Sequence, residues 1–382
     1  MIGRVAWRGG VAPTVEQRLL LRAALLEVAL GRPAWDQWRR ETDIERLDAG
    51  SQRLLPQLYR NVRSYASGEP LLERLKGVYR HTWSANGMLF RDAGRLLQAL
   101  ARADIRTVVL DGGALVTLYY RDHGARAVES IVIMISPDDV PRAATLLAAE
   151  GWRPADSAGS GQPGPYTSQI RLQGEQRPVD LLWDPFPEGC APDIRHAFWT
   201  SAEPGEVAGV ECHTLAPADE LLRICVRASR WEEIPPFRRL ADALVLLRGA
   251  ASRVDWDRLA RQAIRARVVR PVLTSLLLLR QVLNAAVPED TVRRLEDARV
   301  GTGDWLEQRL REAPRPRLGR LPDLLFRYGR LADTQSSGGV RPGLARYLQD
   351  AWGVSRAWQL PLVALAKGVR RVIQPKGPPA AR

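Results

Sequence analysis

The stretch VVLDGGALVTLYYRDHGARAVESIVIMIS, residues 108–136, decides the fold. It begins inside IRTVVL, residues 105–110, a short β-branched run typical of a buried strand. Gly112 and Gly113 end that run, ALVTLYY predicts a helix, and SIVIMIS at 130–136 predicts a second buried strand. The order of strand, glycine turn, helix and strand therefore indicates a mixed α/β unit.

Further elements extend this unit toward the C-terminus. The segment 136–151, SPDDVPRAATLLAAEG, predicts a helix, because Ser136 can cap its start and Pro137 suits its first turn. Two apolar runs follow, YTSQIRL at 166–172 and PVDLLWD at 178–184, and their spacing predicts a β-hairpin. The central unit is therefore expected to contain at least four strands.

Helical patterns flank the centre on both sides. Thr14 is a good N-cap for the apolar spacing that follows it, and a long amphipathic stretch ends near residues 103–104. The predicted fold class is α+β, with a mixed sheet embedded between helical regions. The expected divisions are an N-terminal helical region, an α/β core, a helical bundle and a basic C-terminal helical region rich in Pro, Gly and Arg: 1–104, 105–215, 216–300 and 301–382.

The composition is that of a globular protein with a basic charge. Of 382 residues, 45% are hydrophobic, so a packed core is expected, and the net charge is +13. Nearly all the basic residues are arginines, which indicates either codon bias or a selected surface for phosphate or carboxylate. Three cysteines without paired spacing give no disulfide framework and fit a reducing cytoplasm. No apolar run reaches the ~18–20 residues that a membrane span needs.

The glycine turn and the strand after it carry the expected chemistry. A Gly-Gly turn lets backbone amides approach phosphates, because no Cβ blocks the way. Two acids spaced i, i+2 on the next strand would point to one face, where they could hold magnesium together with a third acid from a neighbouring strand. This is the arrangement of the nucleotidyltransferase fold, which the order of elements resembles.

The sequence resembles one family in particular, the uncharacterised nucleotidyltransferase family of bacteria. The resemblance covers most of 15–300 and rests on the order of several segments: VVLDGGALVTLYY at 108–120, PVDLLW at 178–183, LAPADELLRICVRASR at 215–230 and RRLADALVLL at 238–247. The family implies an Asp-x-Asp pair on the second strand and a third acid on a later strand. It also implies frequent occurrence in biosynthetic loci for modified peptides and other secondary metabolites.

This chain departs from the family at the catalytic positions. Ser130 and Val132 stand where the resemblance implies the Asp-x-Asp pair, and Asp111 stands where the family carries lysine. Asp180 keeps the acid of the later strand, as a residual catalytic acid and metal ligand or as a solvated carboxylate. Losing two carboxylates is expected to abolish nearly all magnesium affinity. The alternative is a rebuilt catalytic site made of Asp180, Glu129 and Asp111.

Nucleotide binding is expected at the glycine turn. Gly112 and Gly113 are candidates for phosphate contact, or they form a turn without a ligand. Arg126 is a third candidate, with phosphate, Glu129 or Asp180 as its partner. The basic segment 313–382 has aromatic residues among its arginines, but core packing explains them better than nucleic-acid binding, and its apolar end suggests weak contact with a membrane surface.

Three functional hypotheses follow. The first is a degenerate, non-catalytic or accessory protein of a biosynthetic pathway that binds a nucleotide, a peptide or a partner protein and needs no cofactor. The second is an active nucleotidyltransferase, using Mg²⁺ and NTP to move a nucleoside monophosphate onto a small molecule or peptide. The third is an arginine-driven protein associated with nucleic acid, which would lose affinity steeply with salt. The first is preferred, because the carboxylate pair is missing.

Overall fold

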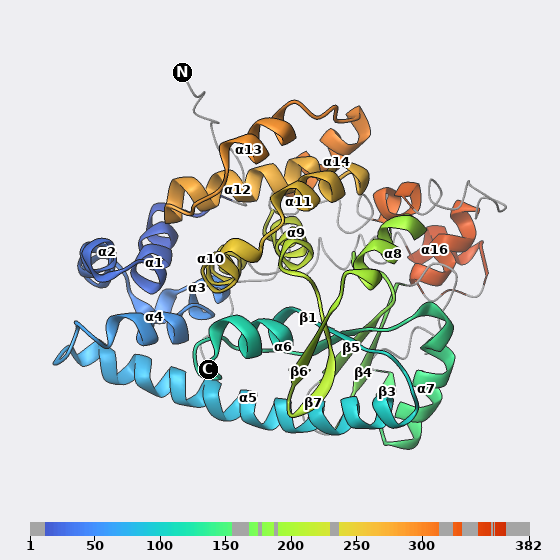
Figure 1. Ribbon diagram of the computed structural model, residues 1–382, viewed down its shortest axis with the longest axis horizontal. Coiled ribbons are helices and arrows are strands. Elements are labelled where there is room, and N and C mark those ends of the chain that lie inside the picture. The colour runs from blue at the N-terminus through green and yellow to red at the C-terminus, as the bar shows by residue number, and fades with distance from the viewer. Residues whose placement is uncertain are drawn as a thin grey trace.

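The computed structural model describes residues 12–154, 168–174, 178–186, 190–229, 237–312, 324–330, 343–352, 354 and 356–363. A mixed seven-stranded sheet lies at the centre and helices cover both of its faces (Figure 1). The predicted α+β class is thereby confirmed. Most of the basic region 313–382 lies outside the described residues, including all of its apolar end beyond residue 363.

The sheet combines strands from distant parts of the chain. Its order is β3-β4-β5-β2-β1-β7-β6, with β2–β5 and β1–β7 parallel and β1–β2, β3–β4, β4–β5 and β6–β7 antiparallel. The strands are β1 Val108–Leu110, β2 Ile131–Met134, β3 Arg153–Pro154, β4 Gln169–Gln173, β5 Pro178–Leu182, β6 Glu203–Val207 and β7 Val210–Thr214.

The helices fall into three groups along the chain (Figure 1). Before the sheet come α1 Val15–Leu25, α2 Val28–Glu41, α3 Ala49–Gln52, α4 Leu55–Val62 and α5 Pro70–Arg102. Between the strands lie α6 Asp111–Leu115, the π-helical turn η2 Val116–Tyr120, the 3₁₀ turn η3 Pro137–Asp139, α7 Val140–Ala149 and α8 Pro192–Thr200. After the sheet follow α9 Pro217–Ala228, α10 Arg238–Ala250, α11 Trp256–Arg265, α12 Val269–Leu283, α13 Glu289–Glu296, α14 Thr302–Glu312 and α16 Leu344–Trp352.

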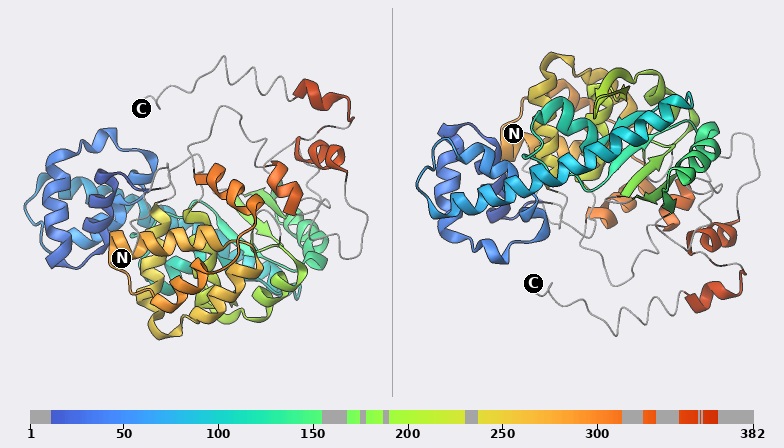
Figure 2. Two further views of the ribbon diagram at one scale, coloured as in Figure 1. Left: turned by 90° about the horizontal axis from the view of Figure 1, so that it is seen from above. Right: turned by 90° about the horizontal axis from the view of Figure 1, so that it is seen from below.

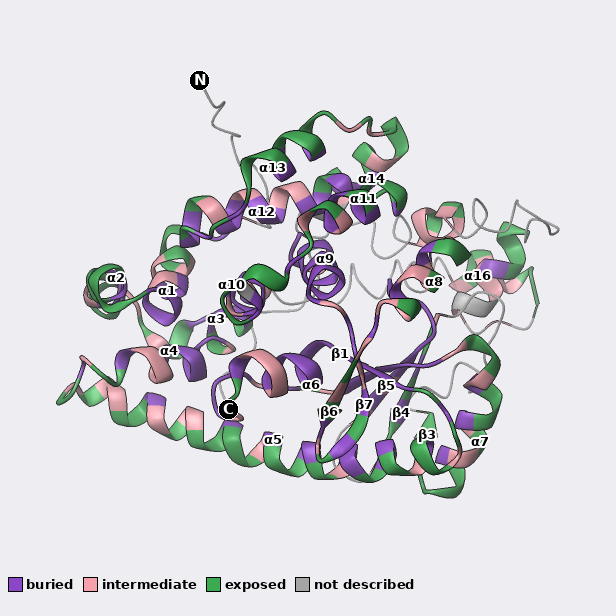
Figure 3. Cartoon of the chain, viewed as in Figure 1, coloured by how far each residue is buried: buried purple, intermediate pink, exposed green. Residues whose placement is uncertain are grey.

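Strand alternation divides the core into two layers. Val109, Ile131 and Ile133 belong to the cluster that contains the apolar faces of α5 and α7. Leu110 and Val132 point to the opposite face and join the larger cluster, which includes α8, α9 and the helices beyond them. Figure 3 shows the result, because α9 is buried almost all round whereas α5 has an exposed outer side. A polar side chain on α9 is therefore removed from water, which is costly unless it finds a partner inside the protein.

The N-terminal helices lie at one end of the molecule and α16 at the other (Figure 2). Thr14 caps α1 and forms a capping box with Gln17, as its position in the sequence predicts. The helix α1 packs on α2 and α4 and also reaches α12, so segments distant in sequence share one core. In the described part of the chain, no helix is both long and apolar enough to cross a bilayer.

Two features of the centre differ from the prediction. The glycines after β1 do not form an open turn, because α6 begins at Asp111 and runs through both of them. The elements α8, β6 and β7 were not predicted, although β7 pairs with β1 and extends the sheet on its far side. The predicted strands at 105–110 and 130–136 and the hairpin of β4 and β5 are confirmed.

Candidate functional site

One row of paired residues crosses the sheet at the positions predicted from the sequence for the metal ligands. Leu110 is paired with Val132, Val132 with Asp180, and Asp180 with Arg171. Paired residues on neighbouring strands point to the same face, and Ser130 joins them through its hydrogen bond to Asp180. We call the sheet face that carries Ser130, Val132 and Asp180 the Asp180 face. The three positions expected from the resemblance therefore lie together.

Both carboxylate oxygens of Asp180 are occupied by protein donors. Arg171 donates from Nε to Oδ1 at 2.7 Å and from Nη2 to Oδ2 at 3.0 Å. Ser130 donates its hydroxyl to Oδ2 at 2.7 Å. The Asp180 side chain is only 14% exposed, so this two-pronged contact neutralises its charge in a sheltered place. An arginine thus stands where a metal ion would bind the same carboxylate.

The remaining residues of the Asp180 face do not fit a magnesium ion. Val132 offers no ligand atom, and Ser130 offers one neutral hydroxyl that already donates to Asp180. Across the described residues, no group of three or more His, Cys, Asp or Glu side chains could hold a metal ion. Magnesium in nucleotide-transferring sites needs carboxylates to offset its dehydration, and one carboxylate paired with arginine does not meet that need.

The other two acids of the hypothetical rebuilt site have partners of their own. Glu129 precedes the strand, is half-exposed, and pairs with Arg53 at 2.8 Å and with Arg238 at 3.9 Å. Asp111 is almost fully buried and binds arginines of α9 and α10. Among the described residues, Asp180 is bound by Arg171 and Ser130 and not by either of these acids.

Asp111 accepts hydrogen bonds from three arginines at this corner of the sheet. Its carboxylate accepts from Arg223 Nη2 at 3.2 Å and from Arg239 Nη1 at 3.5 Å, and it makes a close contact with Arg227. Burial raises the pKa of Asp111, but Arg227, Arg223 and Arg239 outweigh burial and hold it well below the ordinary value. The carboxylate is therefore ionised. The φ of Asp111 is +52°, in the left-handed region, which aspartate adopts more readily than most residues.

The two glycines make room for neighbouring side chains. A Cβ on Gly112 would lie 2.5 Å from Nη1 of Arg126 and 2.9 Å from Val128. A Cβ on Gly113 would lie 2.9 Å from Val109. The space beside Gly112 and Gly113 is thus filled from within the protein, so packing is enough to require glycine at both positions.

Arg126 forms a buried ion pair with a residue of α10. Its guanidinium donates to both oxygens of Asp242, at 2.7 Å from Nε and 3.0 Å from Nη2, and both side chains are buried. The Tyr120 hydroxyl donates to the same carboxylate at 2.9 Å. Burial lowers the pKa of Arg126, but Asp242 outweighs burial and raises it above its ordinary value. This pair joins the loop before β2 to the helical bundle.

The sequence matches one family model over residues 44–284, described as uncharacterised nucleotidyltransferase, which covers more than half of the chain. The chain belongs to this nucleotidyltransferase family. The resemblance to this family stated from the sequence is thereby confirmed over residues 44–284.

Two solved structures are similar to this member of the nucleotidyltransferase family. An antigenic nucleotidyltransferase-like protein from Paracoccidioides brasiliensis shares 15% identity at a TM-score of 0.36, over 56% of this chain and 95% of that chain. The polyadenylate synthase of Megavirus shares 14% identity at a TM-score of 0.26, over 70% of this chain and 56% of that one. No curated protein matches the chain.

In this nucleotidyltransferase-family protein, Glu220 on α9 is a second unusual acid. It is 2% exposed, and neither of its carboxylate oxygens has a hydrogen-bond partner. Burial raises its pKa to about 7, which Arg223 opposes and Asp111 reinforces. The pKa of the buried Arg238 moves in the opposite direction, because burial and Arg126 lower it to about 9. The buried charges between the sheet and the bundle are therefore poorly matched.

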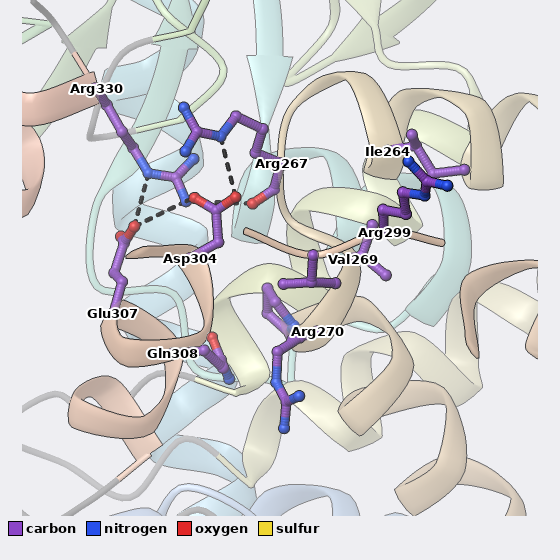
Figure 4. A pocket seen from close by; sticks show the side chains of 11 residues that line it. Ile264, Arg267, Val269, Arg270, Arg299, Asp304, Glu307, Gln308 and Arg330 are labelled. Carbon is purple, nitrogen blue, oxygen red and sulfur yellow. Dashed lines mark hydrogen bonds and ion pairs between the residues drawn. The ribbon is translucent and has the colours of Figure 1, made fainter. Parts of the chain in front are cut away.

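A separate small cavity lies between α11, α12 and α14, and Figure 4 shows its lining. Its volume is about 40 Å³, too small for a nucleotide. Its acids already bind arginines, Asp304 with Arg267 at 3.0 Å and Glu307 with Arg330 at 2.8 Å. These pairs tie the segment 324–330 to the bundle, so we assign the cavity a structural role.

Sequence reasoning missed the arginines that decide the site. Arg171 lies directly opposite Asp180 in the β4–β5 hairpin, so the predicted hairpin could have identified it once the register was known. Arg223 and Arg227 are spaced i, i+4 in a helix whose other residues after Glu220 are apolar, a signal that both face one internal partner. Nothing local in the sequence connects Arg239 with Asp111, because the contact spans more than a hundred residues.

Proposed function

We propose that this nucleotidyltransferase-family protein is a non-catalytic, accessory protein that binds a nucleotide, a peptide or a partner protein without nucleotidyl transfer. The single observation that carries the proposal is the state of Asp180. The one remaining acid of the metal triad is bound through both oxygens by Arg171 and through one by Ser130, with Val132 beside it. A nucleotidyl transfer that depends on magnesium has no carboxylate set on this face.

The wider role proposed is that of an accessory component in a cytoplasmic biosynthetic pathway. Its support is the family resemblance, which implies biosynthetic loci, together with the three cysteines, none of which is paired in a disulfide. All three are buried, and burial raises the pKa of the Cys225 thiol above its ordinary value. Inert thiols of this kind suit a reducing compartment.

The proposal is tested by titrating the purified protein calorimetrically with ATP and with GTP, with magnesium and with EDTA, and by assaying the same samples for pyrophosphate release. We expect no pyrophosphate release and no magnesium-dependent gain in affinity. Micromolar binding that requires magnesium and disappears in Asp180→Asn would overturn the proposal, because it would reveal a working metal site.

A variant with restored ligands provides the matched control. The triple substitution Ser130→Asp, Val132→Asp and Arg171→Gln returns two carboxylates to the Asp180 face and removes the arginine that blocks the third. We expect it to bind Mn²⁺ measurably better than the wild type, because three carboxylates would then converge on one face. If the wild type binds Mn²⁺ as tightly as the triple variant, the missing pair is not what limits metal binding.

A further inference from the structure

The outer side of α5 carries a line of exposed arginines. Figure 2 (right) views this helix from below, where it lies at the surface of the molecule. The four exposed residues that we call the α5 arginine stripe are Arg80, Arg91, Arg95 and Arg102. Because each helical residue turns by about 100° and rises by 1.5 Å, the stripe fits within a sector of about 60° and is about 33 Å long. The exposed residues between them on the same line are Ser84, Gly87 and Gln98.

The charge of the α5 arginine stripe is not balanced from within the protein. Between residues 80 and 102 the sequence has one acid, Asp92, which is half-buried on the flank of the helix. Within the described part of the chain, no side chain of the stripe makes an ion pair or a hydrogen bond. On α2, by contrast, Arg39 pairs with Asp36 one turn away. Arg102 also suits the C-terminal end of the helix dipole, but the other three have no such role.

Two large apolar side chains stand beside the stripe. Trp83 is 58% exposed and Met88 is 45% exposed. Trp83 follows Arg80 by three residues and precedes Gly87 by four, so its ring is a neighbour of the stripe on the helix surface. An aromatic ring beside unpaired arginines is the combination with which proteins bind single-stranded nucleic acid, because the ring stacks on a base while the guanidiniums neutralise phosphates.

The centre of this face fits a nucleic acid better than a membrane or a protein. A helix that lies in a membrane surface inserts a continuous apolar face, whereas Trp83 and Met88 lie on opposite flanks with polar residues between them. The core of a protein interface is depleted in charge, and a second copy of this chain would bring the same net charge of +13. Interfaces with nucleic acid are polar and strongly positive.

We propose that the outer face of α5 binds single-stranded RNA, with the α5 arginine stripe on the phosphates and Trp83 stacked on a base. RNA is the occupant because it presents unpaired segments whose bases are free to stack. This site is separate from the proposed function at the Asp180 face. The apolar side of α5 shares its core cluster with Val109, whereas Val132 of the Asp180 face belongs to the cluster on the other side of the sheet.

The test measures fluorescence anisotropy of a labelled oligouridine of about twelve nucleotides, a length within the usual site size, titrated with the full chain in EDTA. Four phosphate contacts predict a slope of about −2.8 in a plot of log affinity against log salt concentration. We therefore expect the affinity to fall about 50-fold between about 50 and 200 mM salt. If oligouridine does not bind at about 50 mM salt, the inference is overturned.

A pair of matched double variants separates the stripe from the general basic charge. Arg91→Gln with Arg95→Gln removes two phosphate contacts, so binding is expected to weaken at low salt and to fall only about sevenfold over the same salt range. Arg32→Gln with Arg299→Gln removes the same charge at two exposed arginines elsewhere and is expected to keep the wild-type salt dependence. Equal behaviour of the two double variants would overturn the inference. All four positions are exposed, and unchanged unfolding in urea checks that the variants are folded.

The tryptophan and the choice of occupant are tested with the same assay. Trp83→Ala is expected to weaken oligouridine binding about tenfold, the loss of one stacked base, and Trp83→Phe is expected to restore most of it. Equal affinity of Trp83→Ala and the wild type would remove the stacking contact and overturn the inference. Tighter binding of an RNA duplex, of oligothymidine, of an oligoglutamate of the same length or of phosphatidylserine vesicles would also overturn it.

Discussion

Replacing Glu220 by glutamine is expected to stabilise the protein relative to the wild type at alkaline pH. At acid pH the same replacement is expected to give a smaller gain in stability. Glu220 is 2% exposed, and both of its oxygens lack a hydrogen-bond partner. Burial raises its pKa from 4.5 to about 7, with Arg223 opposing and Asp111 adding to the rise. An unpaired buried carboxylate of this kind favours the protonated form.

The sign of the effect follows from the direction of the shift. A carboxyl group that titrates near 7 when folded and near 4.5 when unfolded stabilises the fold fully below pH 4.5. That contribution is lost as the pH rises toward 7, because the unfolded chain has already given up the proton. The shift from 4.5 to about 7 corresponds to about 3 kcal/mol of the free energy of unfolding. The Glu220→Gln variant cannot ionise at this position, so it does not lose that amount.

The assay is urea denaturation of the wild type and Glu220→Gln at pH 4.5 and at pH 8. The difference in unfolding free energy between the two proteins is expected to change by about 3 kcal/mol between these pH values in favour of the variant. Comparing the two proteins at each pH cancels the titration of the other groups, and taking the difference between the two pH values cancels the cost of burying an amide. Glu296→Gln, at an exposed position, is the control. A change below about 1 kcal/mol for Glu220→Gln would refute the reasoning.

Two further predictions concern stability and are measured by the same urea titrations. Asp242→Asn is expected to lower the free energy of unfolding by about 3–5 kcal/mol, because it leaves the Arg126 guanidinium buried without its carboxylate; a loss no larger than that of the exposed control Arg142→Gln would contradict this. Gly112→Ala is expected to cost about 1–3 kcal/mol, since its Cβ would lie 2.5 Å from the Arg126 guanidinium. Gly77→Ala on α5 is expected to stabilise the protein by about 0.5–1 kcal/mol, because its Cβ would meet nothing within 4 Å. Equal effects at the two glycines would exclude the steric argument.

The centre of the fold could be predicted because its elements carry strong local signals. The runs at 105–110 and 130–136 are β-branched and apolar, and both strands are buried on the two faces of the sheet. Ser136 and Pro137 mark the start of the next helical segment, where the Ser136 hydroxyl accepts from the backbone of Asp138. Such signals act between near neighbours, so they survive without knowledge of the tertiary structure.

The hairpin of β6 and β7 could not be predicted in the same way. The strand β6 has the sequence EPGEV, in which proline and glycine are residues that disfavour strands. It lies at the edge of the sheet, where proline is tolerated because one side of the strand makes no ladder hydrogen bonds. Tertiary pairing of β7 with β1 therefore overrode weak local preferences.

The candidate site was predictable in position and only partly in chemistry. Strand alternation alone places Ser130 and Val132 on one face, and the parallel register with β5 brings Asp180 beside them. The partners of the charged residues could not be predicted, because Arg126 binds Asp242 and Asp111 binds Arg239 across more than a hundred residues. Such pairs depend on how α10 docks on the sheet, and no local pattern carries that information.

The acids and arginines at this corner of the sheet can be understood together. In a metal-dependent nucleotidyltransferase, carboxylates hold magnesium so that its positive charge can offset the phosphates. Here Arg171 pairs with Asp180, and Arg223, Arg227 and Arg239 pair with Asp111. A fixed guanidinium can bind a phosphate, but it cannot activate an attacking group or follow the reaction as a hydrated metal can. We therefore expect any nucleotide binding by this chain to be the same in EDTA as in magnesium, and to lead to no transfer.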